Sequence, residues 1–161
     1  MMQNLFRAML VVVSLMLAPA AAIAQNTHAS AAVMSPETLE AAKAVDAFHA
    51  ALSTGDGGGA AAMLVDDALI FESGRAERSR AEYASHHAGA DAAYAAAVPS
   101  KLTQRTGYVE GGTAWIVSES RATGKYQDKP VDRVTTETMI LRKTAEGWRI
   151  AHIHWSSRAA K

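Results

Sequence analysis

The first part of the chain carries apolar residues at helical spacing, and the second part carries the two-residue alternation typical of strands. Ser35 followed by Pro36 is typical of a helix start. Apolar positions then recur three or four residues apart until Gly55. The pattern therefore predicts a first helix over residues 36–53.

Ser79, with Glu82 three residues later, forms a capping box, and Pro99 ends the helical pattern that follows it. The same reasoning predicts a short second helix over 57–65, a strand over 68–73 and a third helix over 79–98. Four more strands are expected, over residues 101–110, 113–123, 130–143 and 147–156. Strands that follow helices indicate an α+β fold, with the last four strands as an antiparallel meander.

The first 24 residues have the pattern of a secretory signal peptide. Arg7 precedes an apolar run, and Ala22-Ile23-Ala24 fits a cleavage site. The alternative is an uncleaved anchor, but the run is shorter than the roughly 20 residues of a membrane span. We therefore predict a signal peptide over 1–24, a flexible leader over 25–35, and one domain over 36–158. A secreted, periplasmic protein without a stable membrane anchor after cleavage is the expectation.

Charge and cysteine content narrow the chemistry. The chain has 16 basic and 16 acidic residues, and loss of Arg7 with the signal leaves a net charge of −1. This balance argues against nucleic acid as a partner. The chain has no cysteine, so disulfides and thiolate ligands or nucleophiles are excluded. It also lacks a Gly-rich phosphate loop, a G-x-S-x-G elbow and an H-E-x-x-H motif.

Two histidines stand in the last predicted strand, in the stretch GWRIAHIHW. Side chains alternate along a strand, so His152 and His154 share a face with Trp148 and Ile150. If that face is the core, the two imidazoles point inward and can converge on a metal ion or a polar molecule. In the alternative register, Ile153 and Trp155 form the core face and both histidines face solvent.

The third predicted helix carries a second group of polar residues. His87 and Asp91 lie four residues apart on one face, with Tyr83 and Tyr94 on or near it. His86 points about a hundred degrees away, and the pattern leaves open which histidine faces inward. Three glutamates are further candidates: Glu72 at a strand end, and Glu119 and Glu137 within strands, where either orientation is open.

These segments together resemble the NTF2-like superfamily, and within it the SnoaL-like and DUF4440-type branch. The resemblance rests on the leading helix, the segment FESGRAERSRAEYASHHAGAD and the closing GWRIAHIHWSSR, from about Glu37 to Arg158. It implies a cone, in which a curved antiparallel sheet is wrapped by three N-terminal helices around a pocket. In such a cone, the following residues could share or line one cavity: Glu72, Tyr83, His86, His87, Asp91, Tyr94, His152 and His154.

Three functions remain open from the sequence. The first is a binding protein for a small ligand or for Zn²⁺ or Cu²⁺, with His87, His152 and His154 as metal ligands. The second is a ketosteroid-isomerase-like enzyme that uses a His/Asp/Tyr set for proton transfer on a small carbonyl compound. The third is a homodimeric association domain, with Ile116, Ile153 and Trp155 on an outer sheet face.

Overall fold

A computed structural model describes residues 34–161 of the chain. The predicted signal peptide over 1–24 and most of the leader over 25–35 lie outside the described residues. Ser35, the last residue of that leader, caps the first helix: its hydroxyl accepts the backbone N–H of Thr38. The predicted first helix thus begins at Pro36, as expected.

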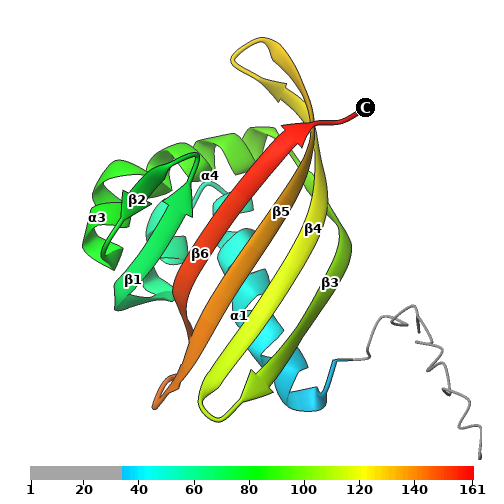
Figure 1. The fold of residues 1–161 in the computed structure, drawn as a ribbon. Coiled ribbons are helices and arrows are strands. Elements are labelled where there is room, and N and C mark those ends of the chain that lie inside the picture. Colours follow the sequence, from blue (N-terminus) through cyan, green and yellow to red (C-terminus); the bar gives the residue numbers. More distant parts are fainter. Residues whose placement is uncertain (1–33) are drawn as a thin grey trace, which may run out of the picture. The chain divides into compact units, whose positions relative to one another are not determined.

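The described part contains helices packed on a single sheet (Figure 1). The helices are α1 (Pro36–Ser53), α2 (Gly57–Ala62), α3 (Arg80–His86) and α4 (Ala88–Ala97). The strands are β1 (Leu64–Glu72), β2 (Arg75–Glu77), β3 (Ser100–Glu110), β4 (Thr113–Tyr126), β5 (Lys129–Thr144) and β6 (Gly147–Ala159). The predicted α+β class is confirmed.

The sheet has the strand order β2-β1-β6-β5-β4-β3. Strands β3 to β6 form the predicted antiparallel meander. The pairing of β1 with β6 is parallel, because the chain crosses over between them through two helices and the meander. Helix α1 lies across one face of the sheet, α3 lies beside β1 and β2, and α4 packs against α1 and contacts β4 (Figure 1). One face of the sheet is therefore covered over only part of its area.

Two predicted boundaries are wrong for local reasons. The second helix ends at Ala62, and Leu64 begins β1, four residues earlier than expected, because the strand includes the Asp66-Asp67 pair. No strand was predicted at β2, since three residues are too few to show a period.

The predicted third helix is divided in two at His87. This residue ends α3 and precedes α4, and its φ of −120° and ψ of −40° lie off the helical values. Gly89, two residues further on, has a low helix propensity, which weakens a continuous helix across the junction. The break leaves the His87 side chain between α4 and the end of β2.

Strand β6 contains a bulge that reverses its alternation. Ile150 pairs with Leu141 of β5, yet His152 pairs with Ile140, so Ala151 is an extra residue. Before the bulge, Trp148 and Ile150 are buried. After it, Ile153 is buried, so the inward positions change from even to odd numbers.

The core lies between α1 and the sheet. Its largest fully buried side chains include Phe48 of α1, Ile70 of β1 and Met139 of β5. Within residues 34–161, no helix is both long and apolar enough to cross a lipid bilayer.

Candidate functional site

A row of polar and aromatic side chains runs across the helix-facing side of the sheet. Register partners on neighbouring strands point to the same face. Following the partners from strand to strand gives Glu72 of β1, Trp155 of β6, Glu137 of β5, Ser118 of β4 and Arg105 of β3. We call these five residues the polar row.

The rows on either side of the polar row differ sharply in burial. On one side, Ile70, Ile153, Met139 and Ile116 form an apolar row that is entirely buried beneath the helices. On the other side, Ser157 is exposed and Thr135 half-buried. The polar row therefore marks the boundary between the core and the open part of this face.

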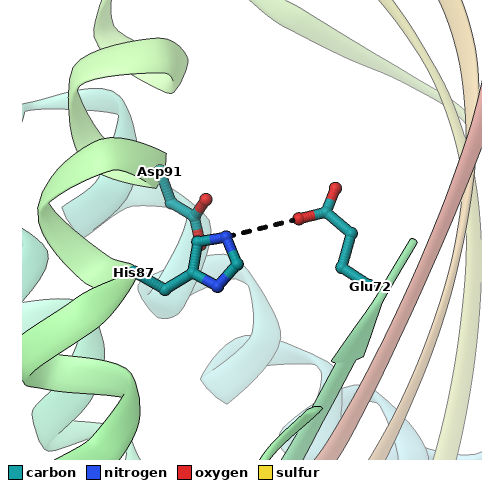
Figure 2. Close-up of side chains that lie close together, drawn as sticks. All are labelled: Glu72, His87 and Asp91. Atoms are coloured by element: carbon teal, nitrogen blue, oxygen red, sulfur yellow. Dashed lines mark ion pairs between the residues drawn. The ribbon is translucent and has the colours of Figure 1, made fainter. Parts of the chain in front are cut away.

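His87 is held at one end of the polar row by a buried carboxylate. Its Nδ1 lies 2.6 Å from Oε1 of Glu77, whose side chain is only 9% exposed. A protonated Nδ1 donates to the carboxylate, so the other ring nitrogen, Nε2, is directed away from Glu77. Nε2 lies 3.8 Å from Oε2 of Glu72, the ion pair drawn in Figure 2.

Glu72, His87 and Asp91 converge from two sides (Figure 2). Glu72 ends β1, while His87 and Asp91 come from the helical side. One ligand atom from each of the three residues lies within 4.8 Å of the others. All three side chains are partly exposed, so small molecules and ions can reach the group from solvent. We call these three residues the His87 cluster.

Tyr83 contacts the His87 cluster through Asp91. It is fully buried, and its hydroxyl donates to Oδ2 of Asp91 at 3.0 Å. Burial and the charge of Asp91 raise the pKa of Tyr83 well above its ordinary value. Tyr83 is therefore a fixed neutral donor.

The charges of the His87 cluster shift two further pKa values. Burial alone would lower the pKa of His87. The hydrogen bond that His87 donates to Glu77 and the negative charges of Asp91, Glu77 and Glu72 outweigh burial and raise that pKa. Burial raises the pKa of Asp91, against the opposing effects of the Tyr83 hydrogen bond and the His87 charge. Both groups therefore hold a proton more readily than in water.

The middle of the polar row contains a second buried carboxylate. Oε2 of Glu137 accepts a hydrogen bond from Nε1 of Trp155 at 2.8 Å and lies 2.8 Å from Nε2 of His49 on α1. Burial would raise the pKa of Glu137, but His49, Trp155 and Arg105 together lower it. Arg105 in turn bonds Ser118 through Nε and Asp46 through Nη1.

The structure answers several questions that the sequence left open. His87 faces inward and His86 is exposed; Glu137 faces inward and Glu119 outward. Tyr94 lies apart from the His87 cluster, with its ring 5.2 Å from that of Tyr126.

The expectation that His152 and His154 share a cavity with His87 is wrong. The bulge at Ala151 turns both imidazoles to the outer face of the sheet, where they flank Phe71 with ring centres 5.1 and 6.4 Å away. Nδ1 of His152 lies 2.9 Å from the carbonyl oxygen of Leu69. The alternative register, with Ile153 in the core, is the one observed.

Sequence reasoning missed Glu77 and His49. Glu77 lies in a strand too short to show a period, so no signal marked it as buried. His49 directly follows Phe48 in the apolar stripe of α1, and a titratable residue beside that stripe was a usable signal. Two surface hollows, of about 300 and 440 Å³, lie elsewhere on the domain and include neither the His87 cluster nor the polar row.

Comparison with known proteins fits this architecture. The SnoaL-like domain family matches residues 41–160. The structure is similar to that of a candidate ketosteroid isomerase from Shewanella frigidimarina NCIMB 400, at 37% identity and a TM-score of 0.71, over 77% of this chain and 100% of that one. No curated protein sequence matches the chain.

Two more distant structures share the fold. A candidate dehydratase of the NTF2-like family from Streptomyces avermitilis matches 77% of this chain and 97% of its own, at 18% identity and a TM-score of 0.68. The hub of the calcium/calmodulin-dependent kinase CaMKII from S. rosetta matches 74% of this chain and 95% of its own, at 19% identity and a TM-score of 0.60. The chain belongs to the SnoaL-like domain family and has the NTF2-like fold.

Proposed function

We propose that this SnoaL-like protein binds a small organic molecule at the open part of the helix-facing side of its sheet and catalyses a proton transfer there. His87 is the general base. The observation that carries the proposal is the orientation of its ring: buried Glu77 holds Nδ1, while Nε2 points toward Glu72. A base whose second nitrogen is fixed by a carboxylate has its tautomer and direction defined before substrate binds.

The reaction that fits this geometry is enolisation of a carbonyl compound. Nε2 of His87 takes a proton from the carbon next to the carbonyl, and the imidazolium formed is stabilised by Glu72 and Glu77. In a carbonyl compound with a neighbouring carbon–carbon double bond, the same proton is then returned to the γ-carbon of the dienolate, which moves the double bond and completes an isomerisation. Asp91, whose pKa is raised, can donate in its protonated form to the enolate oxygen.

Tyr83 has a supporting part in this scheme. Its hydroxyl is buried and already bonded to Asp91, so it orients that carboxyl and does not itself contact substrate. Tyr83, which the sequence suggested as a cavity residue, thus acts through Asp91 in this scheme.

The test is deuterium incorporation next to the carbonyl of small ketones, aldehydes and lactones in D₂O, followed by proton NMR. We expect catalysed exchange for at least one compound class, its loss in His87→Gln, and its retention in His86→Gln. His86 is the matched control, because it is an exposed histidine one residue away. Exchange that survives in His87→Gln would refute the proposal.

A second candidate is a divalent metal ion in the His87 cluster. One imidazole and two carboxylates within 4.8 Å offer a three-ligand set, and Glu77 would orient the imidazole as carboxylates do in many metal sites. A set with one nitrogen and two carboxylate ligands suits Zn²⁺. His152 and His154 are not part of this set.

Metal titration separates the two candidates. For the metal candidate we expect Zn²⁺ or Cu²⁺ to raise the melting temperature saturably, and His87→Ala to abolish the rise. The double variant His152→Ala/His154→Ala should retain it. An unchanged melting temperature, with deuterium exchange that persists in EDTA, would leave the metal-free enzyme as the function.

Export and dimerisation are also proposed. Export rests on the sequence of residues 1–24, and a mature protein that begins at Gln25 by mass spectrometry would support it. Dimerisation through the outer sheet face involves exposed Leu69, Phe71 and Tyr108. The residues predicted for that face, Ile116, Ile153 and Trp155, point to the helix side instead. Sedimentation of Phe71→Lys as a monomer, against a dimeric parent, is the expected result.

A further inference from the structure

On the helix-facing side of the sheet, three carboxylates are not paired with any lysine or arginine of the described residues. Glu72, Glu77 and Asp91 have no Lys or Arg partner within residues 34–161; the ion pairs of the two glutamates are with His87. Arg105, the one guanidinium of the polar row, is already paired with Asp46. Even with His87 protonated, the His87 cluster and Glu77 together carry a net negative charge.

Two buried oxygen atoms on this face have no hydrogen-bond partner among the described residues. They are Oε2 of Glu77 and Oε1 of Glu137, on side chains 9% and 7% exposed. Buried carboxylate oxygens are normally bonded, and an orphaned one is costly. Each atom is an acceptor to which no described residue donates, so neither carboxylate is fully neutralised by hydrogen bonds.

Aromatic rings lie beside these carboxylates. The ring centre of Phe48 is 6.1 Å from that of Trp155 and 6.5 Å from that of Tyr83. Trp155 is only partly buried, and it is the register partner of both Glu72 and Glu137. A partly exposed indole between two carboxylates attracts a cation over its face as well as an apolar group.

From these three observations we propose that the ligand of this face is an organic amine that binds as an ammonium ion. The ammonium group donates to Glu72, and the apolar part of the molecule packs against Trp155. Anionic molecules, such as carboxylates and phosphate esters, are repelled by the same carboxylates. The inference rests on the proposed function for the location of the site, and it adds the chemical class of the ligand.

Three probes of the same skeleton and different charge test the proposal: benzylamine, benzyl alcohol and benzoate. Binding is followed in EDTA through the NMR signals of the Trp155 indole N–H and the His87 ring. We expect benzylamine to bind most tightly and benzoate least. Because hydrogen bonds to charged groups contribute about 1.5–3 kcal/mol, Glu72→Gln should weaken benzylamine about tenfold or more.

The matched control is Glu119→Gln, which removes the same charge from the exposed outer face of β4. It should leave the benzylamine affinity within about twofold, and benzyl alcohol should respond little to either variant. Benzoate binding as tightly as benzylamine would overturn the proposal. So would equal effects of Glu72→Gln and Glu119→Gln.

The amine-binding proposal and the proton-transfer proposal can be refuted independently of each other. Selective benzylamine binding without deuterium exchange on any carbonyl compound would uphold the amine site and remove the proton-transfer activity. Exchange that depends on His87, together with no preference for benzylamine, would uphold the activity and remove the amine site.

Discussion

The hydrogen bond between Glu77 and His87 predicts how stability should change with pH when Glu77 is replaced. Replacement of Glu77 by glutamine keeps the side-chain shape but removes the negative charge that faces His87 Nδ1 at 2.6 Å. Two effects of opposite sign follow. A charge-assisted hydrogen bond is lost, and a buried carboxylate with an unpartnered oxygen is also removed.

The balance of these effects depends on the charge of His87. When His87 is protonated, the lost hydrogen bond between two charged groups is worth about 1.5–3 kcal/mol, and Glu77→Gln destabilises the fold by about that amount. When His87 is neutral, the lost bond is weaker. Removing an unpaired buried charge then stabilises the fold by about 1–3 kcal/mol and offsets the lost hydrogen bond. The free energy of unfolding of the variant is therefore close to that of the parent.

The direction of the pH dependence follows from the raised pKa of His87. A histidine whose pKa is higher in the folded than in the unfolded protein stabilises the fold fully below the unfolded value, about 6.5. That stabilisation is lost as the pH rises through the folded pKa. Glu77→Gln lowers the pKa of His87, so the variant should lose most of this pH dependence.

Urea unfolding of parent and variant at about pH 5.5, below the unfolded value, and at about pH 8.5, above it, measures the difference. NMR titration of the His87 ring gives the pKa directly, with exposed His86 as an internal reference. A His87 pKa that stays the same or rises in Glu77→Gln would refute the reasoning. Equal destabilisation at both pH values would do the same.

Three further predictions concern the sheet and are checked by urea unfolding. Ile153→Ala should destabilise by about 2–5 kcal/mol because Ile153 is fully buried, whereas His152→Ala on the opposite face should cost clearly less; similar values would contradict the assigned faces. Trp155→Phe removes the indole N–H that the buried β5 glutamate accepts, so it should cost about 1.5–3 kcal/mol near neutral pH, less as the pH falls and that glutamate is protonated. Gly107→Ala would force its Cβ against the carbonyl oxygen of Trp115 in β4 and should cost about 1–3 kcal/mol, while Gly112→Ala, with open space around it, should leave the free energy of unfolding nearly unchanged.

The fold could be predicted from the sequence because its signals are local. The Ser35 cap, the Ser79 cap and the alternation in the last four strands each specify an element within a few residues. The order of those elements then gives the α+β class. The parallel pairing of β1 with β6 has no such local signal, because it depends on how residues about 80 positions apart meet.

The site could be predicted where one predicted helix carries its residues and, for Glu72, where a predicted strand ends. His87 and Asp91 lie four residues apart, so the sequence alone places them together. Glu77 comes from a three-residue strand and Glu137 from a strand whose inward face was ambiguous. Their roles appear only when side chains from different elements are seen to meet.

The bulge at Ala151 also bears on how such a domain changes its ligand. Every side chain after it occupies the face that it would not occupy in a regular strand. Deletion of this one residue would bring His152 and His154 to the helix side and send Ile153 and Trp155 to the outside. In descent from a common ancestor, one inserted or deleted codon in β6 could therefore exchange an imidazole lining for an indole lining without any change of the other strands.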